Sequence, residues 1–71
     1  MLTKDDIENM FTYHPPTMLH REKYESIRDA AKLLAMVILI STPSSADQTA
    51  SIRKLRECVM TANAAIALEE P

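Results

Sequence analysis

The chain has 71 residues, a formal net charge of −2 and 46% hydrophobic residues, with no glycine and no tryptophan. A chain this short forms at most one domain and is marginally stable as an isolated monomer. Disulfides, a metal or oligomerisation usually supply the missing stability. The single cysteine, Cys58, excludes an intramolecular disulfide, and the two histidines lie at no ligand spacing that predicts zinc. Composition therefore favours a homo-oligomer, and the slight acidic excess argues against binding a nucleic acid polymer.

The balance of residue types favours helices over strands. Three aromatic residues and many small or aliphatic ones predict an all-α fold. The most apolar stretch, AAKLLAMVILI, is interrupted by Lys32 and is shorter than the roughly 20 residues that cross a bilayer, so we expect no membrane association. The acidic start MLTKDDIEN lacks the order of a signal peptide, which favours a reducing compartment.

The first expected elements are a short helix over residues 3–11 and an extended arm over residues 12–17. Thr3 followed by Asp6 has the spacing of a capping box, which marks the start of the helix. In the arm, TYHPPT, two consecutive prolines remove two backbone donors and force extended conformations. The arm is therefore expected to be stiff.

Two long helices are expected over residues 18–41 and 45–68, which gives one domain built on an antiparallel hairpin. Pro43 ends the first of them, and Ser45 with Gln48 forms an S-x-x-Q cap for the second. Apolar residues recur at alternating steps of three and four along both helices. The expected inner residues are Tyr24, Ile27, Ala31, Leu34 and Ile38 on one helix, and Ile52, Leu55, Val59, Ala62 and Ile66 on the other.

Each long helix also has a second apolar stripe. A two-helix hairpin buries only one face of each helix, so these stripes predict interfaces between subunits, or else a surface for a partner helix. The stripes are Ala30, Leu33, Val37 and Ile40 on the first helix, and Ala50, Met60, Ala64 and Ala67 on the second.

The residues that could carry catalysis are few. Cys58 lies within a helix, far from both histidines, so we expect a buried structural cysteine rather than a nucleophile. The paired carboxylates fall at helix starts and in the tail, where solvated charges are usual, and a chain without glycine has no ordinary phosphate loop. The sequence predicts neither an enzyme nor a cofactor.

The arm and the start of the next helix together hold a set of groups suited to a nucleotide. Aromatic faces stack on bases, and lysine and arginine bind phosphate. On residue types alone, however, we favour the plainer interpretation in which Phe11 and Tyr13 pack the arm onto the hairpin and the charges are solvated. The set comprises Phe11, Tyr13, His14, His20, Arg21, Lys23 and Arg28.

Three segments in order, IENMFTYHPPT, KYESIRDAAKLLA and CVMTANAAIA, resemble the small helical-hairpin phage proteins that act as cyclic-oligonucleotide sponges against CBASS and Thoeris immunity. The resemblance covers nearly the whole chain. It implies a homo-oligomer, a hexamer of hairpins, that acts in the cytoplasm of an infected bacterium. Such proteins sequester cyclic dinucleotides such as cGAMP, and in some cases cyclic trinucleotides, without cleaving them.

The resemblance also implies a ligand site between protomers. The aromatic residue that it places against the ligand is Tyr13, and the basic residue is Arg28 or Lys23. His14 contacts ligand or only holds the arm. Phe11, two residues before Tyr13, we assign to the core.

The chain departs from the family pattern at two positions. Thr61 stands where some members have an aromatic, and Leu68 where some have an arginine, so the resemblance to a trinucleotide site is weaker. Asn63 matches, although a helical asparagine can equally bond across a subunit interface. Two other functions stay open: a structural or regulatory helical-bundle module that binds a partner helix, and a small regulator of DNA binding.

Overall fold

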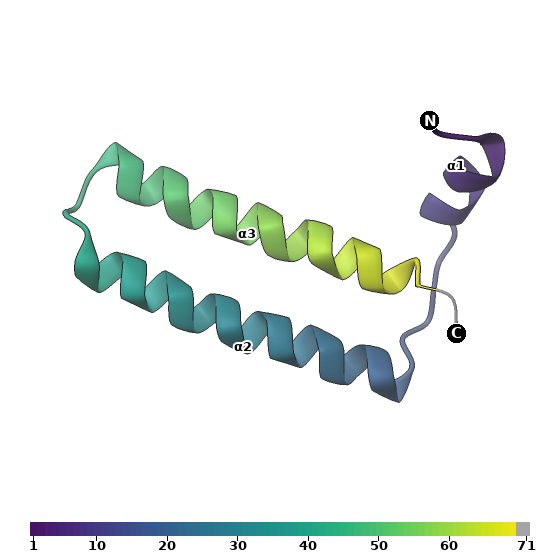
Figure 1. The fold of residues 1–71 in the computed structure, drawn as a ribbon, viewed down its shortest axis with the longest axis horizontal. Coiled ribbons are helices and arrows are strands. Elements are labelled where there is room, and N and C mark those ends of the chain that lie inside the picture. The colour runs from purple at the N-terminus through teal and green to yellow at the C-terminus, as the bar shows by residue number, and fades with distance from the viewer. Residues whose placement is uncertain (70–71) are drawn as a thin grey trace.

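The computed structural model describes residues 1–69 and contains three helices: α1 (Lys4–Met10), α2 (Met18–Ser41) and α3 (Ala46–Ala67). No strand occurs among the described residues, so the all-α prediction is confirmed. The two long helices lie side by side and antiparallel, joined by a tight turn, while α1 lies beyond the open end of this hairpin (Figure 1). No described helix is both long and apolar enough to cross a membrane.

Helix α1 begins with the capping box that the sequence predicts. The Thr3 hydroxyl accepts a hydrogen bond from the Asp6 amide at 3.1 Å, and the Thr3 amide donates to Asp6 Oδ2 at 2.8 Å. The bond from the Thr3 backbone holds the pKa of Asp6 below its ordinary value, because it stabilises the carboxylate. All the bonds of this cap are local, so α1 is defined by its own sequence.

The turn between the long helices is closed by a bond that the sequence pattern did not predict. Ser45 caps α3, its hydroxyl accepting from the Gln48 amide at 3.2 Å. The Gln48 side chain does not return that bond. Its Nε2 donates instead to the carbonyl oxygens of Leu39 at 3.2 Å and Thr42 at 3.1 Å. The last carbonyls of α2 have no partner within their own helix, so Gln48 supplies a donor to groups that would otherwise lack one.

The inner face of the hairpin follows the predicted pattern with one exception. On α3 every expected inner residue is at least half-buried, and Ile66, at 9% exposure, is the most buried side chain among residues 1–69. On α2, Leu34 is 48% exposed and Ala35 takes the inner position instead. A straight helix repeats every 3.6 residues, so a strict alternation of three and four drifts away from the buried stripe.

Two other expected core positions are wrong. Phe11 is 86% exposed and Cys58 is exposed as well. Phe11 ends α1, and no Cα of α1 lies within 8 Å of a Cα of α2 or α3, so no core is within its reach. Cys58 lies on α3 beside the inner residue Val59 but turned away from it, and a hairpin of two helices covers only one face of each.

The single chain leaves much of its surface uncovered. Its accessible surface is 6132 Å², whereas a compact monomer of 8.0 kDa would have about 4,500 Å². Its radius of gyration is 15.4 Å, against about 11 Å for a compact domain of this length. The second stripe of α2 is exposed, with Leu33 at 67%, Val37 at 48% and Ile40 at 82%. The fold therefore presents apolar surface well beyond what a stable monomer shows.

Candidate ligand-binding site

Tyr13 is held in an exposed position on the arm. Its neighbours on both sides bond back to α1: the Thr12 hydroxyl donates to the Glu8 carbonyl at 2.7 Å, and His14 Nε2 lies 2.7 Å from the Asn9 carbonyl oxygen. The Tyr13 side chain between them is 80% exposed. An aromatic ring fixed at its backbone and open to solvent is suited to stack on a planar ligand at low ordering cost.

His14 has a structural role in this conformation. A carbonyl oxygen only accepts hydrogen bonds, so the contact with Asn9 requires the proton to be on Nε2. The same carbonyl oxygen, near the end of α1, also accepts a longer bond of 3.4 Å from the Thr12 amide. His14 therefore holds the arm against α1, and its Nε2 is not available to a ligand while this bond is made.

Lys23 is already paired. Its Nζ lies 2.7 Å from Oε2 of Glu69, at the end of α3, and His20 Nε2 lies 3.7 Å from the same oxygen. The Lys23 hydrogen bond lowers the pKa of Glu69, partial desolvation opposes this, and the charges of Lys23 and His20 add to the lowering. Glu69 thus neutralises Lys23 and joins the two long helices at the open end of the hairpin.

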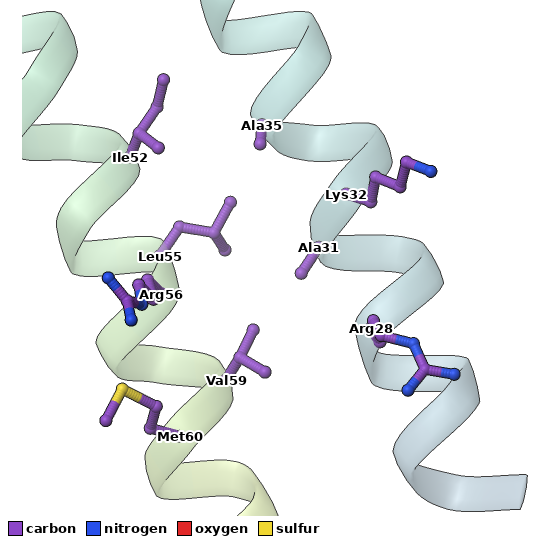
Figure 2. A pocket seen from close by; sticks show the side chains of 9 residues that line it. All are labelled: Arg28, Ala31, Lys32, Ala35, Ile52, Leu55, Arg56, Val59 and Met60. Atoms are coloured by element: carbon purple, nitrogen blue, oxygen red, sulfur yellow. The ribbon is translucent and has the colours of Figure 1, made fainter.

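Arg28 lies at the edge of a groove of about 370 Å³ between α2 and α3. Figure 2 shows Ala31 and Ala35 pointing from α2 toward α3, with Leu55 and Val59 facing them, while the longer side chains point away from this floor. The cations on the edge are Arg28 and Lys32 on α2 and Arg56 on α3. None of the three forms an ion pair with any residue in 1–69.

A single chain does not bring Tyr13 and Arg28 together. The arm runs across the open end of the hairpin, away from the body of α2 (Figure 1). Arg28 lies ten residues after Met18, and so about 15 Å along the helix axis from that end. The Tyr13 ring and the Arg28 guanidinium therefore belong to separate parts of the chain.

Two polar residues matter more than the sequence alone indicated. Glu69 lies in the acidic tail, and an antiparallel hairpin places that tail opposite the basic start of α2, which was the available signal. Asn63 Oδ1 is buried without a hydrogen-bond donor among the described residues.

Residues 1–69 contain no group of three or more side chains that could hold a metal ion.

Comparison with known proteins identifies the family. The family model described as Acb2/Tad1, hairpin domain, matches residues 3–67, which include the capped α1, the arm and nearly all of the hairpin. No curated protein and no solved structure gives a match. The match covers the exposed Tyr13 and Arg28, which has no ion-pair partner among residues 1–69, and it ends just before Glu69. The chain belongs to the Acb2/Tad1 hairpin family, the anti-CBASS and anti-Thoeris sponges.

Proposed function

We propose that this protein is a phage or prophage sponge that binds cyclic dinucleotide immune messengers, such as cGAMP, and withholds them from their effectors without cleaving them. It acts in the cytoplasm of the infected bacterium and blocks CBASS-type signalling. The family supports sequestration rather than catalysis. The observation that carries the proposal is the exposed, backbone-anchored Tyr13 in a chain whose Arg28 has no ion-pair partner among residues 1–69.

The binding residues we propose are Tyr13 for stacking and Arg28 for phosphate. A cyclic dinucleotide presents two bases and two phosphates, so two symmetry-related copies can each offer one ring and one cation. The separation of Tyr13 and Arg28 within one chain fits a site that is completed between chains of a homo-oligomer, for which we propose a hexamer. Cyclic trinucleotides are a secondary ligand class, and Leu68 offers them no charge.

Lys23 and His14 have smaller proposed roles. Lys23 must give up Glu69 before it can bind phosphate, so it contributes less than Arg28. His14 supports the ligand indirectly, because its bond to the Asn9 carbonyl fixes the backbone that carries Tyr13. The number of basic residues near the arm alone would not distinguish these roles from that of Arg28.

Isothermal titration calorimetry against a panel of cyclic dinucleotides tests the proposal. The matched control is the linear dinucleotide of the same bases, which has similar rings and charges but lacks the closed backbone. We expect tight binding of at least one cyclic ligand and much weaker binding of its linear form. Ligand at a hundred times its Kd should also stabilise the protein by about 2.7 kcal/mol, seen as a higher Tm. If all cyclic and linear ligands gave equally weak heats of binding, the proposal would be wrong.

A second function has one observation in its favour. The exposed second stripe of α2, centred on Leu33, Val37 and Ile40, is the kind of surface that binds a partner helix. In that case the protein would be a helical-bundle module, and cyclic dinucleotides would not change its Tm. The same titration therefore separates the two functions.

A further inference from the structure

The open end of the hairpin holds a carboxylate against two basic side chains. Lys23 Nζ contacts both carboxylate oxygens of Glu69, at 2.5 Å from Oε1 and 2.7 Å from Oε2. His20 Nε2 lies 3.7 Å from Oε2 and adds positive charge whenever its ring is protonated. Lysine and protonated histidine form the same charge-assisted bonds to phosphate oxygens as to carboxylates. The group that Glu69 occupies is therefore chemically suited to a phosphate as well.

The helix ends favour an anion on α2 and disfavour one on α3. Helix α2 begins with MLHREK, so His20 lies in its first turn, where the backbone amides create a positive end. Glu69 follows the last turn of α3, where the carbonyls create a negative end. The two ends lie at the same side of the hairpin (Figure 1). Glu69 is therefore stabilised by the neighbouring helix rather than by its own.

The contact lies at the surface, where another anion can displace it. The side chains of Lys23 and Glu69 are 37% and 41% exposed. An ion pair of this kind is weakened by solvent and by salt. The hydrogen bond from Lys23 lowers the pKa of Glu69, so the carboxylate is ionised at neutral pH and the pair is formed there. The pair is thus both present and open to competition.

Lys23 also borders a space that a larger group than a carboxylate could use. It lines an open hollow of about 440 Å³ on α2 that reaches Ile66 of α3. Ile27 and Ile66 contribute apolar atoms to the lining, and Ser26 has a hydroxyl that can donate to a phosphate oxygen. Glu22 lies on the same lining and disfavours an anion near it. An anion in the hollow is therefore favoured on the side of Lys23.

The arm joins α2 at this same end. Thr17, the last residue of the arm, caps α2, and its hydroxyl accepts a hydrogen bond from the His20 amide at 3.1 Å. Tyr13 lies four residues before Thr17, a distance of at most about 14 Å along an extended chain. A phosphate of a ligand that stacks on Tyr13 can therefore reach the basic side chains at the open end.

We propose that His20 and Lys23 form a subsite for one phosphate of the ligand, and that Glu69 occupies this subsite in the absence of ligand as an internal competitor. The identity of the ligand rests on the proposed function, whereas the competition itself requires only a phosphate group. The hairpin tethers Glu69 to the subsite, so it competes at a fixed effective concentration. The family model matches residues 3–67, so the competitor lies outside the matched region.

Inorganic pyrophosphate tests the competition without any cyclic dinucleotide. The full chain is labelled at the lysine side chains and at the glutamate carboxyl groups and is titrated by NMR, with chloride at equal ionic strength as the control for screening. Pyrophosphate should shift the Lys23 and Glu69 resonances in a saturable manner and leave that of Glu57 in place. Glu69→Gln should bind pyrophosphate about two- to sixfold more tightly than the parent, because an exposed ion pair of ordinary strength no longer closes the subsite.

Two controls separate competition from a change in net charge. Glu57→Gln removes the same charge from α3 at a residue that forms no ion pair within residues 1–69, and it should bind pyrophosphate like the parent. In a Lys23→Ala background the gain from Glu69→Gln should disappear. Circular dichroism confirms that each variant remains helical.

Three results of the pyrophosphate titration would overturn the proposal. The first is an equal affinity of the parent and Glu69→Gln. The second is an equal gain in Glu57→Gln, or a full gain that persists without Lys23. The third needs no variant: a Glu69 resonance in the unmodified chain that does not move at saturating pyrophosphate.

Calorimetry with a cyclic dinucleotide connects the subsite to the proposed function. Glu69→Gln should bind the cyclic ligand about two- to sixfold more tightly than the parent, while Glu57→Gln should not. Equal binding by the parent and Glu69→Gln would show that the subsite is not part of the ligand site, and this proposal would be wrong. If no cyclic dinucleotide binds the parent while the competition with pyrophosphate is observed, the proposed function fails and the anion subsite stands.

Discussion

The hairpin and the N-terminal segment are stabilised in different ways. Helices α2 and α3 are tied at the closed end by Gln48, which bonds to carbonyls of α2, and at the open end by the Lys23 and Glu69 ion pair. Helix α1 and the first part of the arm are held by bonds within residues 3–14, and Thr17 at the end of the arm caps α2. The chain itself ties the hairpin at both ends and packs one face of each long helix, whereas α1 has local hydrogen bonds but does not pack on α2 or α3.

This difference is one reason why we propose that recognition involves the less packed part of the molecule. The exposed aromatic rings, Phe11 and Tyr13, both lie in the N-terminal segment, while the third aromatic, Tyr24, is partly covered by the hairpin. Local bonds fix the backbone of the segment and leave its side chains open. A ligand or a second chain can then bind it at a reduced ordering cost.

The largest expected effect is on the hairpin. Ile66→Ala should lower the free energy of unfolding by about 2 to 5 kcal/mol, because it removes the most buried side chain and leaves a cavity. Ile66→Val, which removes one methylene, should cost about 0.5 to 1.5 kcal/mol. Urea unfolding followed by circular dichroism measures both. An Ile66→Ala variant as stable as the parent would mean that stability does not depend on the hairpin interface.

The next effect is on ligand binding by the arm. Tyr13→Ala should weaken cyclic dinucleotide binding by about 1 to 3 kcal/mol for each base that loses its stacking partner. Tyr13→Phe keeps the ring and should bind nearly as well as the parent. Calorimetry on the two variants separates stacking from any role of the hydroxyl. Equal losses in both would show that the ring is not the binding surface.

Arg28 and Lys23 are expected to contribute unequally to ligand binding. Arg28→Ala should cost about 1.5 to 3 kcal/mol of binding, the value of a hydrogen bond to a charged group. Lys23→Ala should cost less, because Lys23 is already neutralised by Glu69. Lys54→Ala, an exposed cation on α3 that does not line the groove, is the matched control and should bind like the parent. A larger loss for Lys23 than for Arg28 would reverse the assignment of the phosphate-binding residue.

The helix caps should respond differently in the two regions. Ser45→Ala removes the N-cap of α3 and should lower the global stability by about 0.5 to 2 kcal/mol. Thr3→Ala removes the cap of α1 and should mainly increase amide hydrogen exchange in residues 4–10, because α1 does not pack on the hairpin. Exchange measured residue by residue distinguishes them. Faster exchange throughout α2 in the Thr3 variant would contradict the independence of the two regions.

The smallest effect concerns pH. The pKa of Glu69 is lowered in the folded chain from its ordinary value of 4.5 by its bond to Lys23. A carboxylate with a depressed pKa stabilises the fold above its unfolded pKa, and this contribution is lost as pH falls through the folded value. Glu69→Gln should therefore show a smaller fall in Tm than the parent between pH 6 and pH 3. Identical pH dependence in the two proteins would indicate that the ion pair does not persist in solution.

Most of the fold follows from short-range signals in the sequence. The capping residues Thr3 and Ser45 mark helix starts, and Pro43 interrupts the pattern at the turn, so the helices and their order are predictable. The incorrect prediction, the inner face of α2, depends on how the two helices pack against each other. Leu34 and Ala35 are neighbours in sequence, and only the 3.6-residue repeat of a straight helix decides which of them faces α3.

The sequence and the resemblance propose the residues of the candidate site, but they do not predict its arrangement. The resemblance named Tyr13, His14, Lys23 and Arg28. Only the structure separates Arg28, which has no ion pair among residues 1–69, from Lys23, which is bound to Glu69, and shows His14 bonded to α1. The sequence assigns Phe11 to the core because it lies at the end of a helix, yet that helix does not pack on α2 or α3 and Phe11 is exposed. No pattern within one chain shows how two copies combine.

The central claim is sequestration without turnover, and one release experiment tests it most directly. The full-length protein is mixed with a limiting amount of the cyclic dinucleotide that it binds, the free nucleotide is measured by filtration and chromatography, and the sample is then heated to unfold the protein. The account predicts that free ligand is depleted in proportion to protein and that intact ligand is recovered in full after heating. Undepleted ligand, or recovery of a linear or hydrolysed product, would contradict it.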